Sequence, residues 1–182
     1  MRMVDQAQIR QFLDSCRFLS LESFGSRAGE DSQFDLILEV AELKSQPRQT
    51  DSQSADQGAV ATLEVHTFED IRQVVEANAD PLVVGPDSAI FTILFKGYAA
   101  FQIKNETMSL LEPNEDFSKK LRIYEKSRFL NHVATSTWAL EYASDWLGEP
   151  LKHFAVICVD HIIDVACPSD PILSMRALAE VE

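Results

Sequence analysis

The sequence predicts an α+β protein: a single domain over residues 1–182, with a mainly antiparallel sheet of about six strands built from hairpins and about three packed helices. Segments with hydrophobic residues at every second position alternate with segments of helical periodicity. Turn signals between neighbouring strand segments favour hairpins over the crossovers of a parallel, doubly wound fold. A length of 182 residues with 46% hydrophobic residues is enough for one globular core.

The first part of the chain predicts a helix, a strand and a loop. Hydrophobic residues at helical spacing indicate a helix near the N-terminus, at Ile9, Phe12, Leu13 and Cys16. Residues 34–43 alternate and predict a half-exposed strand, with Asp35 and Glu39 on the solvent side. Residues 44–58 contain no large apolar residue, so we expect a flexible polar loop there.

A second strand, a helix and a tight hairpin follow this loop. Residues 59–66 alternate like a strand, and Thr67 stands at the N-cap position of a helix over residues 67–78. Residues 90–103 predict a hairpin that turns at Lys96 and Gly97, with two mainly apolar faces. We therefore expect these two strands in the middle of a sheet that is covered on both sides.

Short strands and a capped helix come next. Residues 107–111 and 121–125 are short strand candidates, separated by a segment rich in turn residues. Ser127 predicts the N-cap of an amphipathic helix, and a second helical piece ends near Gly148.

The stretch HFAVICVDHIIDVACP, residues 153–168, combines His, Cys and Asp side chains with apolar residues. A hairpin that turns at Asp160 and His161 would pair Cys158 with Ile163, and Ile157 with Asp164. One face is then wholly apolar, and Asp164 projects from the other, where we expect at least partial solvation. This hairpin favours a structural role over a metal or catalytic site.

No catalytic motif is recognisable, so the sequence assigns no catalytic residue. If the protein is an enzyme, its site must come from dispersed residues, and the first to suspect are His132, His153, Asp160, His161 and Asp164. We expect no metal site, because the hairpin holds Cys158 and Cys167 roughly 13 Å apart. The chain has 6 glycines and lacks a phosphate-binding loop, so we expect no cofactor.

Lys126, Ser127 and Arg128 form a weak candidate for an anion site. They stand at a predicted helix start, where free backbone N–H groups point outward. Ordinary helix capping by Ser127 is the simpler interpretation of the same three residues.

The net charge of −13, from 16 basic and 29 acidic residues, is spread over the whole chain. Such a charge opposes binding to nucleic acid and to anionic membranes, and it favours solubility or a basic protein partner. The longest strongly apolar run, residues 154–159, is too short for a membrane helix, and the first residues lack a signal segment. We therefore expect a soluble cytoplasmic protein with reduced cysteines.

These observations predict a soluble, non-enzymatic domain that binds another protein. One concrete form is a bacterial immunity-protein or antitoxin role against a basic partner. The alternative is an enzyme or small-molecule binder with a site assembled from dispersed His and Asp residues. An enzyme predicts a deep pocket with convergent polar groups, whereas an interaction domain predicts a shallow apolar patch with an acidic rim. The sequence gives no indication of the oligomeric state.

Overall fold

The computed structural model describes residues 5–29, 33–46, 67, 79–110, 112, 116–139 and 149–177. Within these residues the protein is α+β with antiparallel sheets, as the sequence predicts. The described part contains nine strands, two α-helices and one 3₁₀ turn, which corrects the expected counts of about six strands and about three helices. Neither described α-helix has the length and apolar content that a membrane span requires.

The chain divides into two compact units, residues 1–43 with 84–182, and residues 44–83. In the second unit, Lys44 and Ser45 pair antiparallel with β3 (Leu82–Val83). The expected loop at 44–58 therefore begins later than predicted, and its residues 47–58 lie outside the described part. The predicted strand at 59–66 and, apart from Thr67, the helix at 67–78 also lie outside it.

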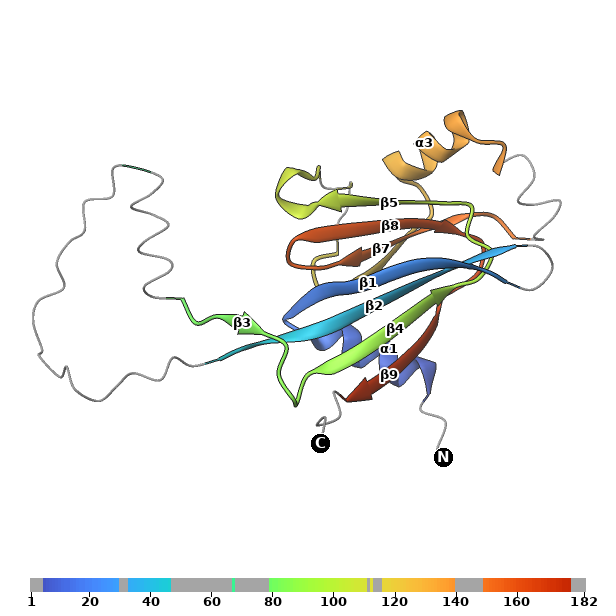
Figure 1. Cartoon of the computed structure of the whole chain (residues 1–182). Helices are drawn as coiled ribbons and strands as arrows, with labels where there is room; N and C mark the ends of the chain where they lie inside the picture. Colours follow the sequence, from blue (N-terminus) through green and yellow to red (C-terminus); the bar gives the residue numbers. More distant parts are fainter. Residues whose placement is uncertain are drawn as a thin grey trace, which may run out of the picture. The chain divides into compact units, whose positions relative to one another are not determined.

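Two antiparallel sheets form the first unit (Figure 1). The first sheet has the order β1-β2-β4-β9, with β1 (Phe18–Ala28), β2 (Phe34–Ser45), β4 (Ala89–Phe95) and β9 (Ile172–Ala177). The second has the order β5-β8-β7-β6, with β5 (Ala100–Asn105), β8 (His161–Cys167), β7 (Lys152–Ile157) and β6 (Leu121–Tyr124). The sequence did not predict β1 as a strand. A register shift between Leu21 and Ser23 interrupts the alternation of side chains in this strand.

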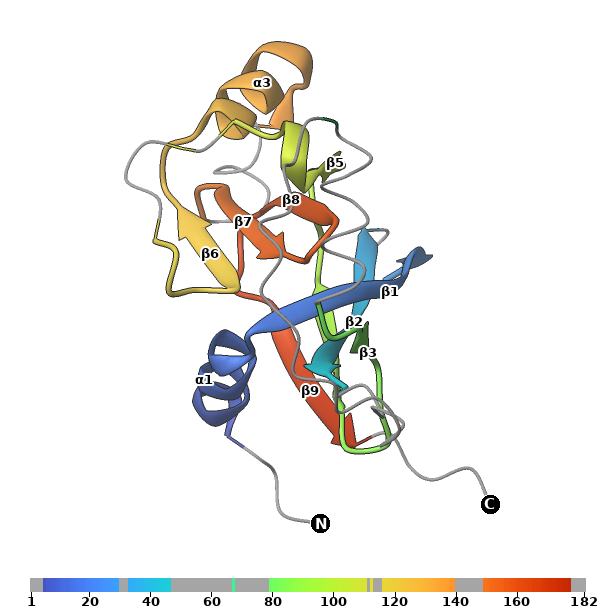
Figure 2. The same ribbon diagram turned by 90° about the vertical axis from the view of Figure 1, so that its left-hand side faces the viewer.

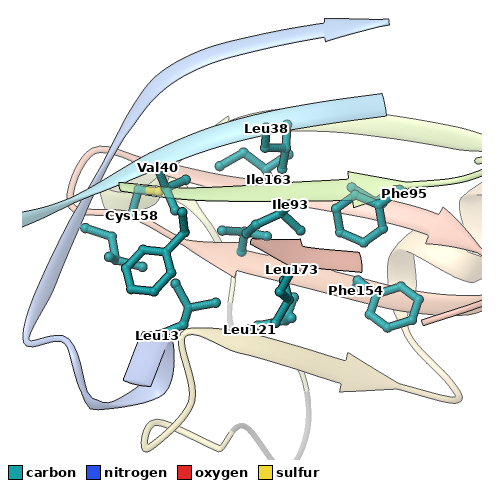
Figure 3. Packing of buried hydrophobic residues seen from close by; sticks show 14 of the residues in the cluster. Leu13, Leu38, Val40, Ile93, Phe95, Leu121, Phe154, Cys158, Ile163 and Leu173 are labelled. Atoms are coloured by element: carbon teal, nitrogen blue, oxygen red, sulfur yellow. The ribbon is translucent and has the colours of Figure 1, made fainter. Parts of the chain in front are cut away.

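The main hydrophobic core lies between these sheets (Figure 3). The rings of Phe95 in β4 and Phe154 in β7 meet there, with centroids 5.5 Å apart. Removing a large apolar side chain of this kind from water stabilises the fold by about 1.5–3 kcal/mol. β4 has the central place in the sheet that its apolar faces predict.

The predicted hairpin over residues 90–103 is wrong, because β4 and β5 belong to different sheets. β4 pairs with β2 and β9, and β5 pairs with β8. Gly97, with φ of 62°, redirects the chain between them, and its N–H donates to the Asp35 carboxylate at 3.4 Å. Asp35 is buried, which contradicts the expectation that it lies on the solvent side of its strand.

The predicted hairpin over residues 153–168 is confirmed as β7 and β8, with a register shifted by two residues. Val156 pairs with Ile163, and Ala155 pairs with Asp164. A shift of two residues keeps every side chain on its predicted face. The predicted core face, from Phe154 to Cys167, is therefore buried between the sheets.

The N-terminal helix α1 (Gln6–Ser15) is confirmed, and it binds the backbone at the edges of both sheets. Its side-chain contacts come from residues one turn apart: Gln6, Arg10 and Asp14. The Gln6 amide bonds both the N–H and the carbonyl of Leu173 in β9. Arg10 donates to the carbonyl of Leu121 in β6, and Asp14 accepts from its N–H.

Helix α3 (Arg128–Ser136) begins as predicted at Ser127, whose hydroxyl accepts from the Leu130 N–H at 3.0 Å. The helix packs on the outer face of the second sheet, where Phe129, Leu130 and Val133 form a smaller core with Ala166. Figure 2 shows α3 beside β5 and β8, at the far end from α1. Residues 106–108 form a 3₁₀ turn, not the predicted strand, and the second helical piece lies mostly outside the described part.

Candidate functional site

The structure brings together two of the suspected residues, His153 in β7 and Asp164 in β8. Each is only 1% exposed. The expectation that Asp164 is partly solvated is wrong, because α3 covers the face from which it projects. His132 lies apart from them on the exposed side of α3. Asp160 lies in the exposed hairpin turn as predicted, but His161 is the first residue of β8, where it is exposed and pairs with Asn105.

Strand register explains why His153 and Asp164 meet. His153 lies opposite Ala166, and Asp164 lies opposite Ala155, so the two side chains are diagonal neighbours on one face. On the next strand, Gln102 lies directly opposite Asp164. Lys104 lies two residues further along β5 and therefore projects from the same face.

Asp164 accepts hydrogen bonds from three side chains. Its Oδ1 atom lies 2.9 Å from His153 Nε2, and its Oδ2 atom lies 2.7 Å from both Lys104 Nζ and Gln102 Nε2. Burial alone would raise the pKa of Asp164, but the bonds from His153, Lys104 and Gln102 outweigh it and lower the pKa. Asp164 is therefore a carboxylate at neutral pH.

The charge of Asp164 fixes the direction of its hydrogen bond with His153. An ionised carboxylate only accepts, so His153 Nε2 carries a proton and donates it. The Nδ1 atom of His153 is buried and has no hydrogen-bond partner among the residues that the structure describes.

Aromatic rings flank the imidazole of His153. The Tyr124 ring stacks on it at 4.9 Å between centroids, and the Phe129 ring of α3 lies 5.2 Å away at 59°. Burial raises the pKa of Tyr124, so its phenol stays protonated at neutral pH. His153 thus contacts both β6, through Tyr124, and α3, through Phe129, and its imidazole is only 1% exposed.

An open groove of about 500 Å³ lies between β5 and α3. Its polar lining includes Gln102, Lys104 and His132, and its apolar lining includes Met108, Leu110 and Phe129. Met108 is 84% exposed and Leu110 is 77% exposed. Gln102 and Lys104 thus connect the groove with the buried Asp164, while His153 and Asp164 themselves do not line it.

The weak anion candidate receives no added support. Ser127 caps α3, and Arg128 lines the groove, whereas Lys126 is exposed outside it. The backbone N–H of Arg128 donates to both carboxylate oxygens of Glu112, at 3.1 and 3.3 Å. A carboxylate of the chain itself thus occupies the place where an anion would bind at this helix start.

No group of three or more His, Cys, Asp or Glu side chains gathers as metal ligands within the described residues. Burial raises the pKa of the Cys158 thiol to about 12, so this cysteine is an unreactive core residue. Cys16 and Cys167 are likewise buried and free of disulfides.

Sequence reasoning missed Gln102, Lys104 and Tyr124. The signal for the first two was present, because residues 101–104 alternate apolar and polar side chains and so indicate one polar face. We did not use this signal, because we expected the segment to pair with residues 90–95 in a hairpin. Tyr124 had no sequence signal, because its role depends on the pairing of β6 with β7, which places it directly opposite His153.

Comparisons of this chain with protein-family models, with curated proteins and with solved structures gave no match in any of the three.

Proposed function

We propose that this protein acts by binding another protein, and that the groove between β5 and α3 is its contact site. The observation that carries the proposal is the exposure of Met108 and Leu110 beside an open groove. Exposed large apolar side chains that line one groove are typical of interaction surfaces.

Two charged side chains at the groove already have partners within the chain. Lys104 pairs with Asp164, and Glu112 accepts from the backbone of Arg128. The net charge of −13 on the whole chain favours a basic partner. A role of the immunity-protein or antitoxin kind is one concrete form of this proposal.

The enzymatic alternative has less support. Of the five suspected residues, only His132 lines the groove. His153 and Asp164 are 1% exposed and enclosed by aromatic and apolar side chains, so neither reaches a substrate there. The geometry favours binding over catalysis.

A peptide selection tests the proposal. The immobilised full chain is presented with a display library of short linear peptides, and enriched peptides are synthesised and their affinities measured. We expect peptides that combine apolar residues with Lys or Arg. Their affinity should fall about tenfold in the Met108→Ser/Leu110→Ser double variant, because two apolar contacts are lost.

Phe117→Ser is the matched control. Phe117 is 67% exposed but precedes β6, at the opposite edge of the second sheet. Its replacement should leave the affinity unchanged. Enriched peptides that bind the double variant as tightly as the native chain, or an absence of enrichment, would contradict the proposed function.

A further inference from the structure

The terminal strands of the two sheets differ in how their outer backbone groups are satisfied. Helix α1 covers two of these strands. The Gln6 side chain bonds Leu173 on β9, at 2.8 Å to the carbonyl and 2.7 Å to the N–H. Arg10 and Asp14 bond Leu121 on β6, both at 3.1 Å. On each of these two edges, α1 thus occupies the outward backbone groups of one residue, which hinders pairing with another strand there.

The terminal strand β1 is guarded in other ways. The carbonyl of Leu19 accepts from the N–H of Val159 at 2.8 Å, which uses its outer edge near the start. The register shift at Glu22 and the charges of Glu22 and Arg27 interrupt the rest of the strand. Bulges and charged side chains are common devices that prevent an edge strand from pairing.

β5 has less protection than these strands within the described part of the chain, because only one outer carbonyl, that of Asn105, is bonded by a side chain. It pairs with β8 on one side. On its other side the Asn105 carbonyl accepts from the Ser109 hydroxyl at 2.7 Å, and no other described group bonds the outer backbone. Its one lysine, Lys104, would ordinarily block such an edge, but its ammonium is folded onto Asp164 of the same sheet. Among the described residues, the outward N–H and C=O groups of Phe101 and Ile103 are therefore open to a further strand.

Apolar side chains lie on both faces beside this edge. On the α3 side are Met108 and Leu110. On the other face, Phe24 of β1 is 54% exposed and contacts Phe101 of β5, with ring centroids 6.2 Å apart. A strand added here would bury its alternate side chains on both of these surfaces, because successive side chains point to opposite faces.

We propose that the protein binds its partner by β-strand addition: an extended segment of a basic protein pairs with the free edge of β5. The segment carries apolar residues on both faces, and Lys or Arg at the end beside Glu106 and Asp160. These two acidic residues lie at the end of β5, where the Glu106 N–H donates to the Asp160 carbonyl at 3.1 Å. This inference rests on the proposed function and names the mode of binding.

The test uses the peptides selected on the full chain, each N-methylated at one backbone position at a time. Strand addition predicts that methylation at every second position lowers the affinity at least about tenfold, because alternate N–H groups bond β5. Hydrogen exchange of alternate β5 amides should slow on binding. Phe24→Ser should weaken binding, whereas Phe117→Ser should not.

Two failures are distinguishable. Peptides that depend on Met108 and Leu110, tolerate methylation at all positions and leave exchange in β5 unchanged would overturn strand addition and keep the proposed function. Peptides that do not depend on Met108 and Leu110 would overturn both.

Discussion

The two faces of the β7–β8 hairpin are both buried, but they are stabilised by different means. The face toward the first sheet is entirely apolar, with Ile163 and Val165 fully buried. The face toward α3 carries His153 and Asp164, each 1% exposed, in a hydrogen-bonded cluster. The same alternation of residues therefore gives a core on one side and a polar network on the other.

This difference shows that alternation predicts a face but not its burial. Asp164 and Ile163 are adjacent in sequence, and period two correctly separates them. Helix α3 covers the Asp164 face, and its residue Phe129, which is distant from Asp164 in sequence, packs against His153 there. A polar residue opposite a core face is thus solvated or buried according to a distant element.

The largest expected effect comes from placing a charge on the apolar face. Ile163→Asp buries a carboxylate without a partner, a cost of several kcal/mol that is comparable with the whole stability of a domain. We expect this variant not to fold, as judged by circular dichroism and by the loss of a cooperative urea transition.

The neighbouring substitution Ile162→Asp is its matched control. Ile162 is half-buried on the other face and lies opposite Lys104, which can pair with the new carboxylate. This variant should remain folded. Equal damage by both substitutions would mean that the two faces do not differ as described.

The second prediction breaks the polar network. Asp164→Ala removes the acceptor shared by His153, Lys104 and Gln102 and should cost about 3 kcal/mol in the free energy of unfolding. Asp164→Asn keeps the shape and should cost about 1.5–3 kcal/mol, because it removes the charge and replaces one accepting oxygen by an NH2 group that faces a donor. Urea unfolding at neutral pH measures both, and a loss under about 0.5 kcal/mol would indicate a solvated Asp164.

The third prediction concerns pH. The pKa of Asp164 is lowered in the folded state, so its stabilising contribution is fully present above the unfolded value of about 3.9 and is lost as the pH falls through the folded pKa. The difference in stability between the native chain and Asp164→Asn should therefore narrow below about pH 4. A difference that stays constant from neutral pH to acid would show that the pKa is not lowered.

The sequence was informative about local structure and weak about pairing. Caps and periodicity located α1, α3, β4 and the β7–β8 hairpin, because Ser127 and the apolar positions act within a few residues. They failed at Lys96–Gly97, where a turn dipeptide that favours a hairpin connects two different sheets. A strand with two apolar faces, such as β4, does not specify its neighbour.

The candidate site was less accessible to sequence reasoning for the same reason. His153 and Asp164 were both suspected, but the hairpin alone gave no reason to bury them. Lys104 and Gln102 reach Asp164 only because β5 pairs with β8, a contact between segments about sixty residues apart. Chemistry that depends on such non-local pairing leaves little local signal.

The smallest expected effect compares two lysines of equal exposure. The Lys104 side chain is 33% exposed, and its Nζ atom lies 2.7 Å from Asp164 Oδ2. The Lys152 side chain is 35% exposed, and its Nζ atom lies 3.0 Å from Asp170 Oδ1. Their partners differ, because the Asp164 side chain is 1% exposed and the Asp170 side chain is 63% exposed.

Lys104→Met should cost about 1 kcal/mol in the free energy of unfolding, because Asp164 then keeps only His153 and Gln102 as donors in a dry site. Lys152→Met should stay within about 0.5 kcal/mol, as for an exposed ion pair that water and salt screen. Raising the salt concentration should reduce the cost of Lys152→Met more than that of Lys104→Met. If both substitutions cost the same, the face under α3 behaves as ordinary surface, and the contrast between the two faces of the hairpin is wrong.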